Sequence, residues 1–101
     1  MQLAEKDIQL LQNFFRDKPV LKAFIFGSYA RNEADEKSDL DILVELDYSR
    51  HVGLEFAGMQ LDLETMLKKK VDLVSQNGLS KFIAPLIATE KKLIYEKAAG
   101  R

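Results

Sequence analysis

The sequence has no cysteine and no tryptophan, and it has only two prolines among its 101 residues. The lack of cysteine excludes disulfide bonds and thiolate metal ligands, and it fits a reducing cytoplasm. No stretch approaches the roughly 18 consecutive apolar residues that span a bilayer. The amphipathic, acidic N-terminus is unlike a secretory signal. We therefore expect a soluble cytoplasmic protein with no membrane association.

An excess of charge of either sign is also missing. The 15 Lys and Arg residues oppose 16 Asp and Glu residues, which leaves a net charge of -1. A protein that binds nucleic acid without sequence preference is normally visibly basic, so we expect no nucleic-acid partner. What the chain does have is a hydrophobic content of 47%, enough to bury a core. We expect a single domain over residues 1–101.

Hydrophobic periodicity predicts helices and strands in alternation, which favours an α+β fold. The predicted helices cover residues 3–17, 28–33, 54–69 and 79–89. The predicted strands cover residues 20–26, 39–46 and 70–75, and residues 92–95 can form a short fourth strand. We expect a small mixed sheet of three to four strands flanked by helices.

The first segment of functional interest is an apolar strand that runs into Gly27 and Ser28, where a short helix is predicted to begin. Glycine lets the backbone turn sharply and lets a ligand approach, and serine can cap a helix. The free N–H groups of a first helical turn suit a phosphate group. A plain turn with a helix cap has the same pattern, and for this segment alone it is the better interpretation.

Two aspartates open the second predicted strand. Because side chains on a strand alternate between faces, Asp39 and Asp41 point the same way while Leu40 and Ile42 point into the core. Two carboxylates on one face repel each other unless a cation lies between them, and Mg²⁺ prefers such oxygen ligands. A solvated polar strand end is an equally good interpretation of this pair alone.

A third carboxylate, Asp72, opens the third predicted strand, and by itself it is best interpreted as a solvated strand end. The three segments become informative together. If strands 20–26 and 39–46 are antiparallel, the end of the first meets the start of the second. If strand 70–75 runs parallel to strand 39–46, with helix 54–69 as the crossover, Asp72 reaches the same edge. That edge would carry a phosphate cradle and three carboxylates. These are the groups that a nucleophilic substitution at phosphorus with two metal ions requires.

In this order the motifs resemble the nucleotidyltransferase superfamily, whose signature is Gly-Ser, a spacer, Asp-x-Asp and a later Asp. Here Gly27–Ser28 is followed by ten residues, then by Asp39-Leu40-Asp41, and later by Asp72. The length of this spacer is similar to that of minimal nucleotidyltransferase (MNT) domains. Asn32 departs from the pattern, because many relatives carry glycine there. Asparagine also tolerates a left-handed backbone, so we expect little change.

The resemblance implies roles for individual residues. Asp39 and Asp41 would hold two Mg²⁺ ions, and Asp72 would complete the second metal site and help to activate the attacking hydroxyl. Gly27 and Ser28, with neighbouring backbone N–H groups, would hold the terminal phosphates of ATP. Together with Arg31 as a third nucleotide-binding residue, these are the catalytic, metal-binding and nucleotide-binding residues that we expect.

Three further side chains carry less weight. Arg31 can neutralise phosphate charge, or it can pair with a surface acid such as Glu33 or Asp35. Tyr29 can stack on a base or pack in the core. The single histidine, His51, lies in a polar loop, and we interpret it as a surface residue.

MNT domains are commonly paired with a helical HEPN-type protein in toxin–antitoxin modules, where the MNT member is the antitoxin. The resemblance thus implies an enzyme that transfers AMP from ATP to a hydroxyl, of tyrosine by the same resemblance, on such a partner. The alternative is a non-catalytic protein that neutralises its partner by covering it. A further alternative is a small-molecule adenylyltransferase subunit, although such enzymes usually need a second domain for the acceptor.

Two predicted helices carry more apolar residues than one core-facing stripe needs. In helix 3–17 the excess comprises Leu3, Leu10 and Phe14. In helix 54–69 apolar residues occupy most of the circumference. Such an excess usually marks an interface. A helical partner and a homodimer would both cover it, and the resemblance favours the partner.

Overall fold

The computed structural model describes residues 3–50 and 52–98, so His51 lies outside the described residues. The described chain forms α1 (Glu5–Arg16), β1 (Val20–Phe26), β2 (Leu40–Leu46), α2 (Gly53–Leu67), β3 (Val71–Ser75), a short 3-10 helix (Gln76–Gly78), α3 (Ala84–Glu90) and β4 (Lys92–Glu96). Among these described helices, none is long and apolar enough to cross a membrane.

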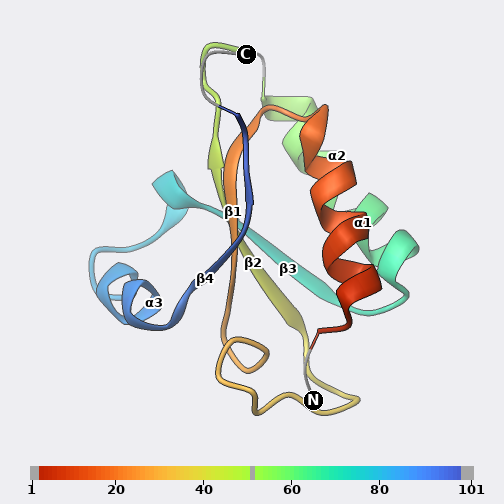
Figure 1. Ribbon diagram of the computed structural model, residues 1–101. Helices are drawn as coiled ribbons and strands as arrows, with labels where there is room; N and C mark the ends of the chain where they lie inside the picture. The colour runs from red at the N-terminus through yellow and green to blue at the C-terminus, as the bar shows by residue number, and fades with distance from the viewer. Residues whose placement is uncertain (1–2, 51, 99–101) are drawn as a thin grey trace.

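The strands form one mixed sheet in the order β3-β2-β1-β4 (Figure 1). β1 is antiparallel to both β2 and β4, whereas β2 is parallel to β3. α2 is the crossover that joins the parallel pair. The predicted α+β fold class is therefore confirmed, and so are the antiparallel first pair and the parallel second pair.

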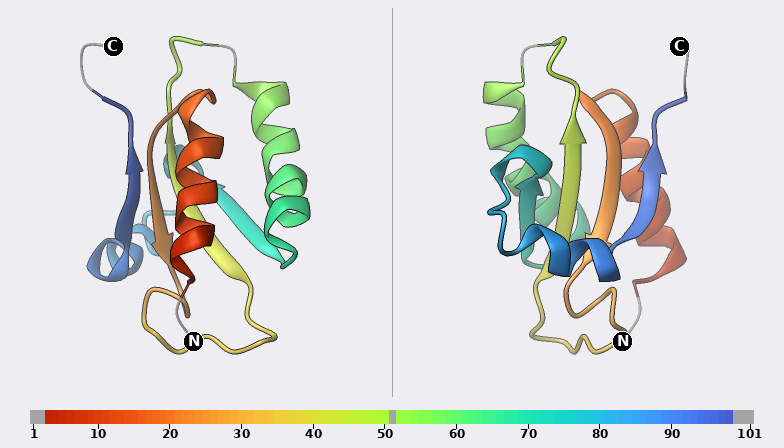
Figure 2. Two further views of the ribbon diagram at one scale, coloured as in Figure 1. Left: turned by 45° about the vertical axis from the view of Figure 1, so that its right-hand side comes forward. Right: turned by 90° about the vertical axis from the view of Figure 1, so that its left-hand side faces the viewer.

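α1 and α2 cover one face of the sheet and bury the main core against it (Figure 2). Alternation along β2 turns Leu40, Ile42 and Val44 towards these helices, where all three are fully buried. The helices contribute apolar side chains at helical spacing, namely Leu11 and Phe15 from α1 and Met59, Leu63 and Leu67 from α2. These five side chains form the helical side of the main core.

α3 covers part of the opposite face, as the right-hand view of Figure 2 shows. Phe24 of β1, Leu43 of β2 and Ile87 of α3 form a second, smaller core there. α3 has seven residues, against fifteen in α2. The two faces of the sheet are therefore covered unequally.

The helix predicted over residues 28–33 is wrong, because the chain makes a turn there. Gly27 and Asn32 both have a left-handed backbone, with φ of 73° and 62°. Two left-handed residues so close together leave no room for a right-handed helix between them. The turn is held by a hydrogen bond of 3.1 Å from Arg31 N to Gly27 O. The left-handed backbone expected at Asn32 is confirmed.

Two further boundary differences stand out, and the other predicted bounds lie within two residues of the observed ones. The helix predicted over residues 79–89 begins at Ala84, because a turn precedes it in which the Ser80 hydroxyl accepts a backbone hydrogen bond of 3.2 Å. β2 begins at Leu40, so Asp39 lies just before the strand and not in it. The second difference matters for the site, because Asp39 is not fixed by the ladder of the sheet.

Candidate active site

The residues selected from the sequence lie at one end of the sheet, the lower end in Figure 1, where β1 ends and β2 and β3 begin. Phe26, Asp41 and Asp72 are direct neighbours across the three strands. They share the face on which α3 lies, because Leu40 and Ile42, on either side of Asp41, face α1 and α2. The register of the sheet thus brings Asp41 and Asp72 together.

The three aspartates interact electrostatically. Asp41 is half-buried, whereas Asp39 and Asp72 are exposed. Burial raises the pKa of Asp41 to about 6, and the neighbouring carboxylates of Asp72 and Asp39 add to the rise, because like charges disfavour ionisation. The end of the sheet is therefore a place where negative charge is costly.

This donor set suits a divalent metal ion. Mg²⁺ takes carboxylate oxygens as ligands, and a cation near Asp41 and Asp72 would offset the repulsion that raises the pKa of Asp41. Within residues 3–50 and 52–98, no three Asp, Glu or His side chains are gathered closely enough to form a finished metal site. The residues fit Mg²⁺ in chemistry, and their side chains would have to turn towards the ion.

Gly27 follows β1 beside Asp41, and two features of this position require glycine. Its φ of 73° lies in the left-handed region that other residues rarely adopt. In addition, a Cβ atom at this position would overlap the Oδ2 atom of Asp41. Glycine therefore allows the Asp41 carboxylate to lie against the backbone of the turn.

The N–H group of Gly27 points at an acidic side chain that sequence analysis did not select. Gly27 N donates a hydrogen bond of 2.6 Å to Oε2 of Glu90, the last residue of α3. Arg31 Nη1 donates a hydrogen bond of 2.9 Å to the other oxygen, Oε1. Glu90 therefore connects the backbone of the turn to the Arg31 guanidinium.

Arg31 is exposed and pairs with two acids. Its Nε atom lies 2.9 Å from Oε1 of Glu33, in addition to the contact with Glu90. Hydrogen bonds to Glu33 and then to Glu90 raise the pKa of the guanidinium. Pairing with a surface acid, one of the two interpretations left open by the sequence, is thus present at Glu33, whereas the Asp35 carboxylate accepts a hydrogen bond from the Ser38 hydroxyl. The other interpretation, that Arg31 neutralises phosphate charge, stays a prediction.

A cleft of about 570 Å³ opens at this end of the sheet. Its charged side holds the turn, Arg31 and Asp41, and its apolar side is formed by α3 and the end of β1. The lining residues are Phe26, Gly27, Ser28, Arg31, Asp41, Ile83, Leu86, Ile87, Thr89 and Glu90. Asp39 and Asp72 are not among them. A cleft of this composition suits a ligand with one strongly charged part and one apolar or aromatic part.

Similarity to known proteins decides the family. The family model described as polymerase beta, nucleotidyltransferase matches residues 9–99. The chain belongs to the nucleotidyltransferase family. A Methanocaldococcus jannaschii protein assigned as a protein adenylyltransferase is 39% identical to this nucleotidyltransferase over 95 residues, which cover 92% of this chain and 90% of the relative. The resemblance seen in the sequence is confirmed, and so is the prediction of a nucleotidyltransferase enzyme.

Solved structures agree with this assignment. A protein assigned as a minimal nucleotidyltransferase is 34% identical, with a TM-score of 0.64, and the match covers 86% of this chain and 85% of that protein. A toxin–antitoxin complex with AMP-PNP matches at a TM-score of 0.73 and 19% identity, over 93% of this chain and 75% of that one. A complex of tri-AMPylated Shewanella oneidensis HEPN toxin with MNT antitoxin matches at a TM-score of 0.70 and 20% identity, over 92% of this chain and 72% of that one. Because their sequence identities are only 19% and 20%, these two complexes show that the fold is shared with this nucleotidyltransferase, and no more.

Two parts of the nucleotidyltransferase cleft were not predicted from the sequence, namely Glu90 and the apolar wall from α3. The sequence predicts a strand over residues 92–95 but does not give its partner. Antiparallel pairing with β1 places Lys92 opposite Ile25, and so Glu90 beside Gly27. The pairing of the last strand is the signal that would have found Glu90.

Tyr29 packs in the core of the nucleotidyltransferase, which is one of the two interpretations left open for it. Its side chain is 7% exposed. Lys69 Nζ lies 5.1 Å from the centre of the ring and 3.4 Å from the hydroxyl. The same amine is 3.8 Å from Asp7 of α1. Tyr29 thus anchors the turn to the helix-covered side of the sheet.

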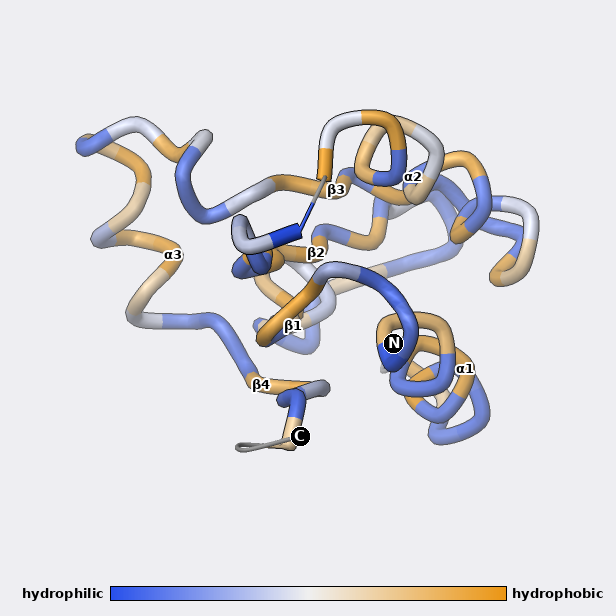
Figure 3. The backbone as a smooth tube through the Cα atoms, turned by 90° about the horizontal axis from the view of Figure 1, so that it is seen from above, coloured by the Kyte–Doolittle hydropathy of each residue, from blue (hydrophilic) through white to orange (hydrophobic). Residues whose placement is uncertain are grey.

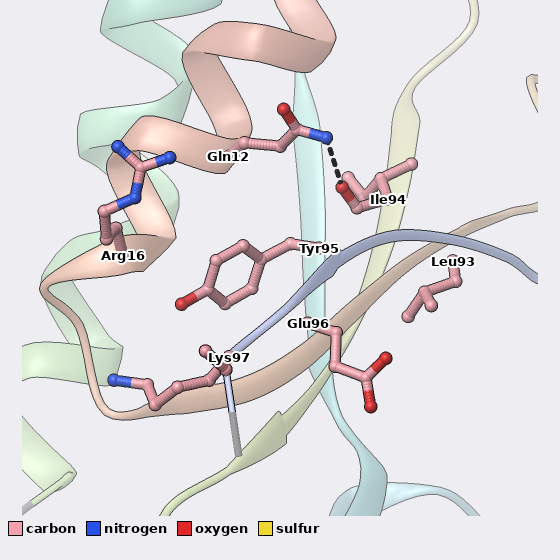
Figure 4. Close-up of a pocket in the computed structure, with 8 residues that line it drawn as sticks. Gln12, Arg16, Leu93, Ile94, Tyr95, Glu96 and Lys97 are labelled. Carbon is pink, nitrogen blue, oxygen red and sulfur yellow. Dashed lines mark hydrogen bonds between the residues drawn. The ribbon is translucent and has the colours of Figure 1, made fainter. Parts of the chain in front are cut away.

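A second cleft, of about 590 Å³, lies between α1 and β4 (Figure 4). Gln12 and Arg16 line it from α1, and Tyr95 lines it from β4. Gln12 Nε2 donates a hydrogen bond of 2.9 Å to the carbonyl oxygen of Ile94. Its lining shares no residue with the carboxylates and the turn of the nucleotidyltransferase site, so we assign the chemistry to the other cleft.

Proposed function

We propose that this nucleotidyltransferase moves AMP from ATP to a tyrosine hydroxyl of a helical HEPN-type partner, with Mg²⁺, and thereby acts as an antitoxin in the cytoplasm. The observation that carries the proposal is the pairing of Asp41 with Asp72 beside the Gly27 turn. A relative assigned as a protein adenylyltransferase supports a protein acceptor. The fold shared with an MNT antitoxin bound to an AMPylated HEPN toxin supports the kind of partner.

Each site residue has a role in this proposal. Asp39, Asp41 and Asp72 would hold Mg²⁺, which supplies positive charge to the oxygens of the triphosphate. Gly27 and Ser28 line the cleft together with Asp41, and the Gly27 N–H group and the Ser28 hydroxyl would bind phosphate oxygens. The nucleotide would thus lie between the turn and the carboxylates.

The transfer is a substitution at the α-phosphorus of ATP. The acceptor oxygen forms a bond to the α-phosphorus while the bond from that phosphorus to the α–β bridging oxygen breaks, and pyrophosphate leaves. The hydroxyl proton passes to a carboxylate. Asp72 is the candidate base, because it is exposed and therefore accessible to an acceptor, whereas Asp41 is half-buried.

Exposed apolar side chains next to the cleft support a protein acceptor. Phe82 is 76% exposed and Leu86 is 65% exposed, and Leu86 and Ile83 line the cleft itself. Figure 3 shows the α3 segment, rich in hydrophobic positions, on the side of the sheet away from α1 and α2. Apolar groups gathered on the surface of a small domain usually mark an interface. A partner tyrosine that packs there would bring its hydroxyl close to the charged side of the cleft.

The apolar excess predicted on the first two helices is exposed in part. Leu54 and Leu61 of α2 and Leu10 of α1 are exposed. Leu3 and Phe14 are partly buried against the main core. We propose that the exposed part of α2 adds to the partner interface. A homodimer would cover the same side chains, and the oligomeric state of the chain alone tests this.

Mass spectrometry on purified proteins tests the proposed function. The chain is mixed with the protein that the neighbouring gene encodes, Mg²⁺ and ATP are added, and intact masses are measured. We expect the partner to gain one or more AMP groups, and fragment spectra to place them on tyrosine. Asp41→Asn should abolish the gain. Asp17→Asn, which changes an exposed acid at the C-terminal end of α1, should leave it unchanged.

Other outcomes would replace the proposal. A stable complex with no change in mass would support an antitoxin that acts by covering its partner. Transfer of AMP to a small hydroxyl compound, with none to the protein, would support a small-molecule adenylyltransferase. The absence of both transfer and complex formation would contradict the toxin–antitoxin assignment.

A further inference from the structure

The Glu90 carboxylate lies at the charged side of the cleft, beside Gly27 and Arg31. Its two oxygens accept hydrogen bonds of 2.6 Å from Gly27 N and 2.9 Å from Arg31 Nη1. The Glu90 side chain is 23% exposed, half the 46% of Arg31. The contact with Gly27 joins residues that are 63 positions apart in the chain, so it is made by the tertiary fold.

The two donors that hold Glu90 are groups that bind phosphate well. A backbone N–H group in a left-handed turn and an arginine guanidinium both prefer anionic oxygens. A carboxylate presents two such oxygens, as one edge of a phosphate group does. Glu90 therefore makes the contacts that a phosphoryl group of the nucleotide would make with Gly27 and Arg31.

Glu90 also adds negative charge to an end of the sheet that holds three other carboxylates. Glu90 and Asp41 line the same cleft. A polyphosphate that entered beside Glu90 would meet strong repulsion in this half-buried place. The carboxylate and the phosphate therefore exclude each other.

The fold explains why Glu90 lies there. Lys92, the first residue of β4, pairs with Ile25 of β1, so the end of α3 must come next to the residue that follows β1. Lys91, between α3 and β4, has its Nζ atom 4.3 Å from the centre of the Phe24 ring. This contact fixes the connection and leaves the Glu90 side chain directed at the turn.

We propose that Glu90 is a built-in competitor for a phosphate subsite formed by the Gly27 N–H group and the Arg31 guanidinium. Glu90 occupies the subsite in the nucleotide-free protein, and a phosphoryl group displaces it on binding. This inference rests on the proposed function, since it takes Gly27 and Arg31 as phosphate ligands. It makes Glu90 a specificity-determining residue, because a polyphosphate carries enough charge to replace a carboxylate and a monophosphate does so poorly.

Calorimetry with Mg²⁺ and inorganic tripolyphosphate, which has no base or sugar, measures this subsite directly. Glu90→Gln keeps the size of the side chain but removes its charge, so the hydrogen bonds from Gly27 and Arg31 lose about half their strength. We expect the dissociation constant of tripolyphosphate to fall about tenfold, while the melting temperature stays the same or falls. The Gly27 amide signal in NMR spectra should also move in this variant.

Glu33→Gln is the matched control. Glu33 also lies 2.9 Å from Arg31, but among the described contacts its side chain does not reach Gly27. Because Glu33 is exposed, we expect its loss to change the affinity by less than about twofold. Glu90→Asp gives a second test, since the shorter side chain withdraws from both donors. It should also bind tripolyphosphate more tightly than the original chain does.

Unchanged or weaker binding of tripolyphosphate in Glu90→Gln and Glu90→Asp would overturn the inference, because Glu90 would then support the site. Equal gains in Glu90→Gln and Glu33→Gln would also overturn it, because a general charge effect would explain both. The proposed function is judged separately, by AMP on the partner. A chain that binds tripolyphosphate as expected but transfers no AMP would contradict the function and keep the role of Glu90.

Discussion

The two faces of the sheet differ in how completely helices cover them. Below α1 and α2, the fully buried side chains of Leu40, Ile42 and Val44 belong to one large core. On the other face, Leu43 belongs to a small core with Phe24 and Ile87. Burial of apolar area is the main source of folding free energy. The covered face therefore stabilises the fold and allows the other face to collect carboxylates that repel one another.

The boundary between the two faces runs between adjacent residues. Leu40 faces the large core and Asp41 faces the cleft, and in β3 Leu73 faces that core while Asp72 lies on the opposite face. Changes on one face should thus alter stability, and changes on the other should alter chemistry. Four predictions test how far this division holds.

Asp72→Asn should have the largest effect on chemistry. If Asp72 accepts the hydroxyl proton, transfer of AMP should slow by about 10²–10⁴-fold. Because the side chain is exposed, the free energy of unfolding should change by less than about 0.5 kcal/mol. Single-turnover rates, urea denaturation and calorimetry with Mg²⁺ and ATP measure the three quantities. Equal loss of binding and transfer would show that Asp72 chiefly holds the metal that carries the nucleotide.

Leu63→Ala and Leu86→Ala compare the two faces with one substitution. Leu63 of α2 is 0% exposed, whereas Leu86 of α3 is 65% exposed. Leu63→Ala should lower the free energy of unfolding by about 2–5 kcal/mol through lost burial and a cavity. Leu86→Ala should lower it by less than about 0.5 kcal/mol and weaken transfer to the partner. Similar destabilisation by both in urea would mean that α3 serves mainly to hold the fold.

Gly27→Ala should affect both the site and stability, because Gly27 lies against Asp41 and has a left-handed backbone. Its φ of 73° would cost an alanine about 1–2 kcal/mol, and the added Cβ would displace Asp41. Gly58→Ala is the control: Gly58 lies within α2 with open space around it, so alanine should stabilise by about 0.5–1 kcal/mol. Thermal melting and binding of Mg²⁺-ATP measure the pair. Normal nucleotide binding by Gly27→Ala would place the cradle elsewhere.

The smallest effect is a dependence of stability on pH. Burial raises the pKa of Asp41 to about 6, so the folded state holds this proton more tightly than the unfolded chain, whose aspartates titrate near 4. Stability of the metal-free protein should therefore fall as pH rises from about 4 to above 6. Asp41→Asn should reduce that fall and raise the melting temperature above pH 7. A pH profile identical in the two proteins would contradict this assignment.

Local pattern predicted much of the fold. The strand over residues 20–26 has the predicted bounds, because a run of apolar residues ends at Gly27 and follows Pro19. The pairing of Asp41 with Asp72 could also be reasoned out, because a helix between two strands favours a parallel pair. These features depend on neighbours in sequence or on a common topological rule.

Features that depend on contacts between distant parts of the chain could not be predicted from the sequence. The helix predicted over residues 28–33 does not form, because the backbone at Gly27 and Asn32 is left-handed. The sequence of so short a segment does not show which residues adopt that conformation. Glu90 could not be placed without the pairing of β4 with β1. The exposure of Leu86 depends on the face that α3 covers, which its own spacing does not give.

The contact between α1 and β4 has a consequence for the protein at high concentration. β4 is an edge strand, and its register with β1 shifts between Ala23 and Phe24, which leaves Ile94 as a bulge. The Gln12 amide donates to the Ile94 carbonyl at 2.9 Å. A regular, unpaired edge is a template on which another molecule can add a strand. The bulge and its glutamine partner interrupt that template, so this edge resists the strand-by-strand stacking that turns a concentrated solution into fibres or a gel.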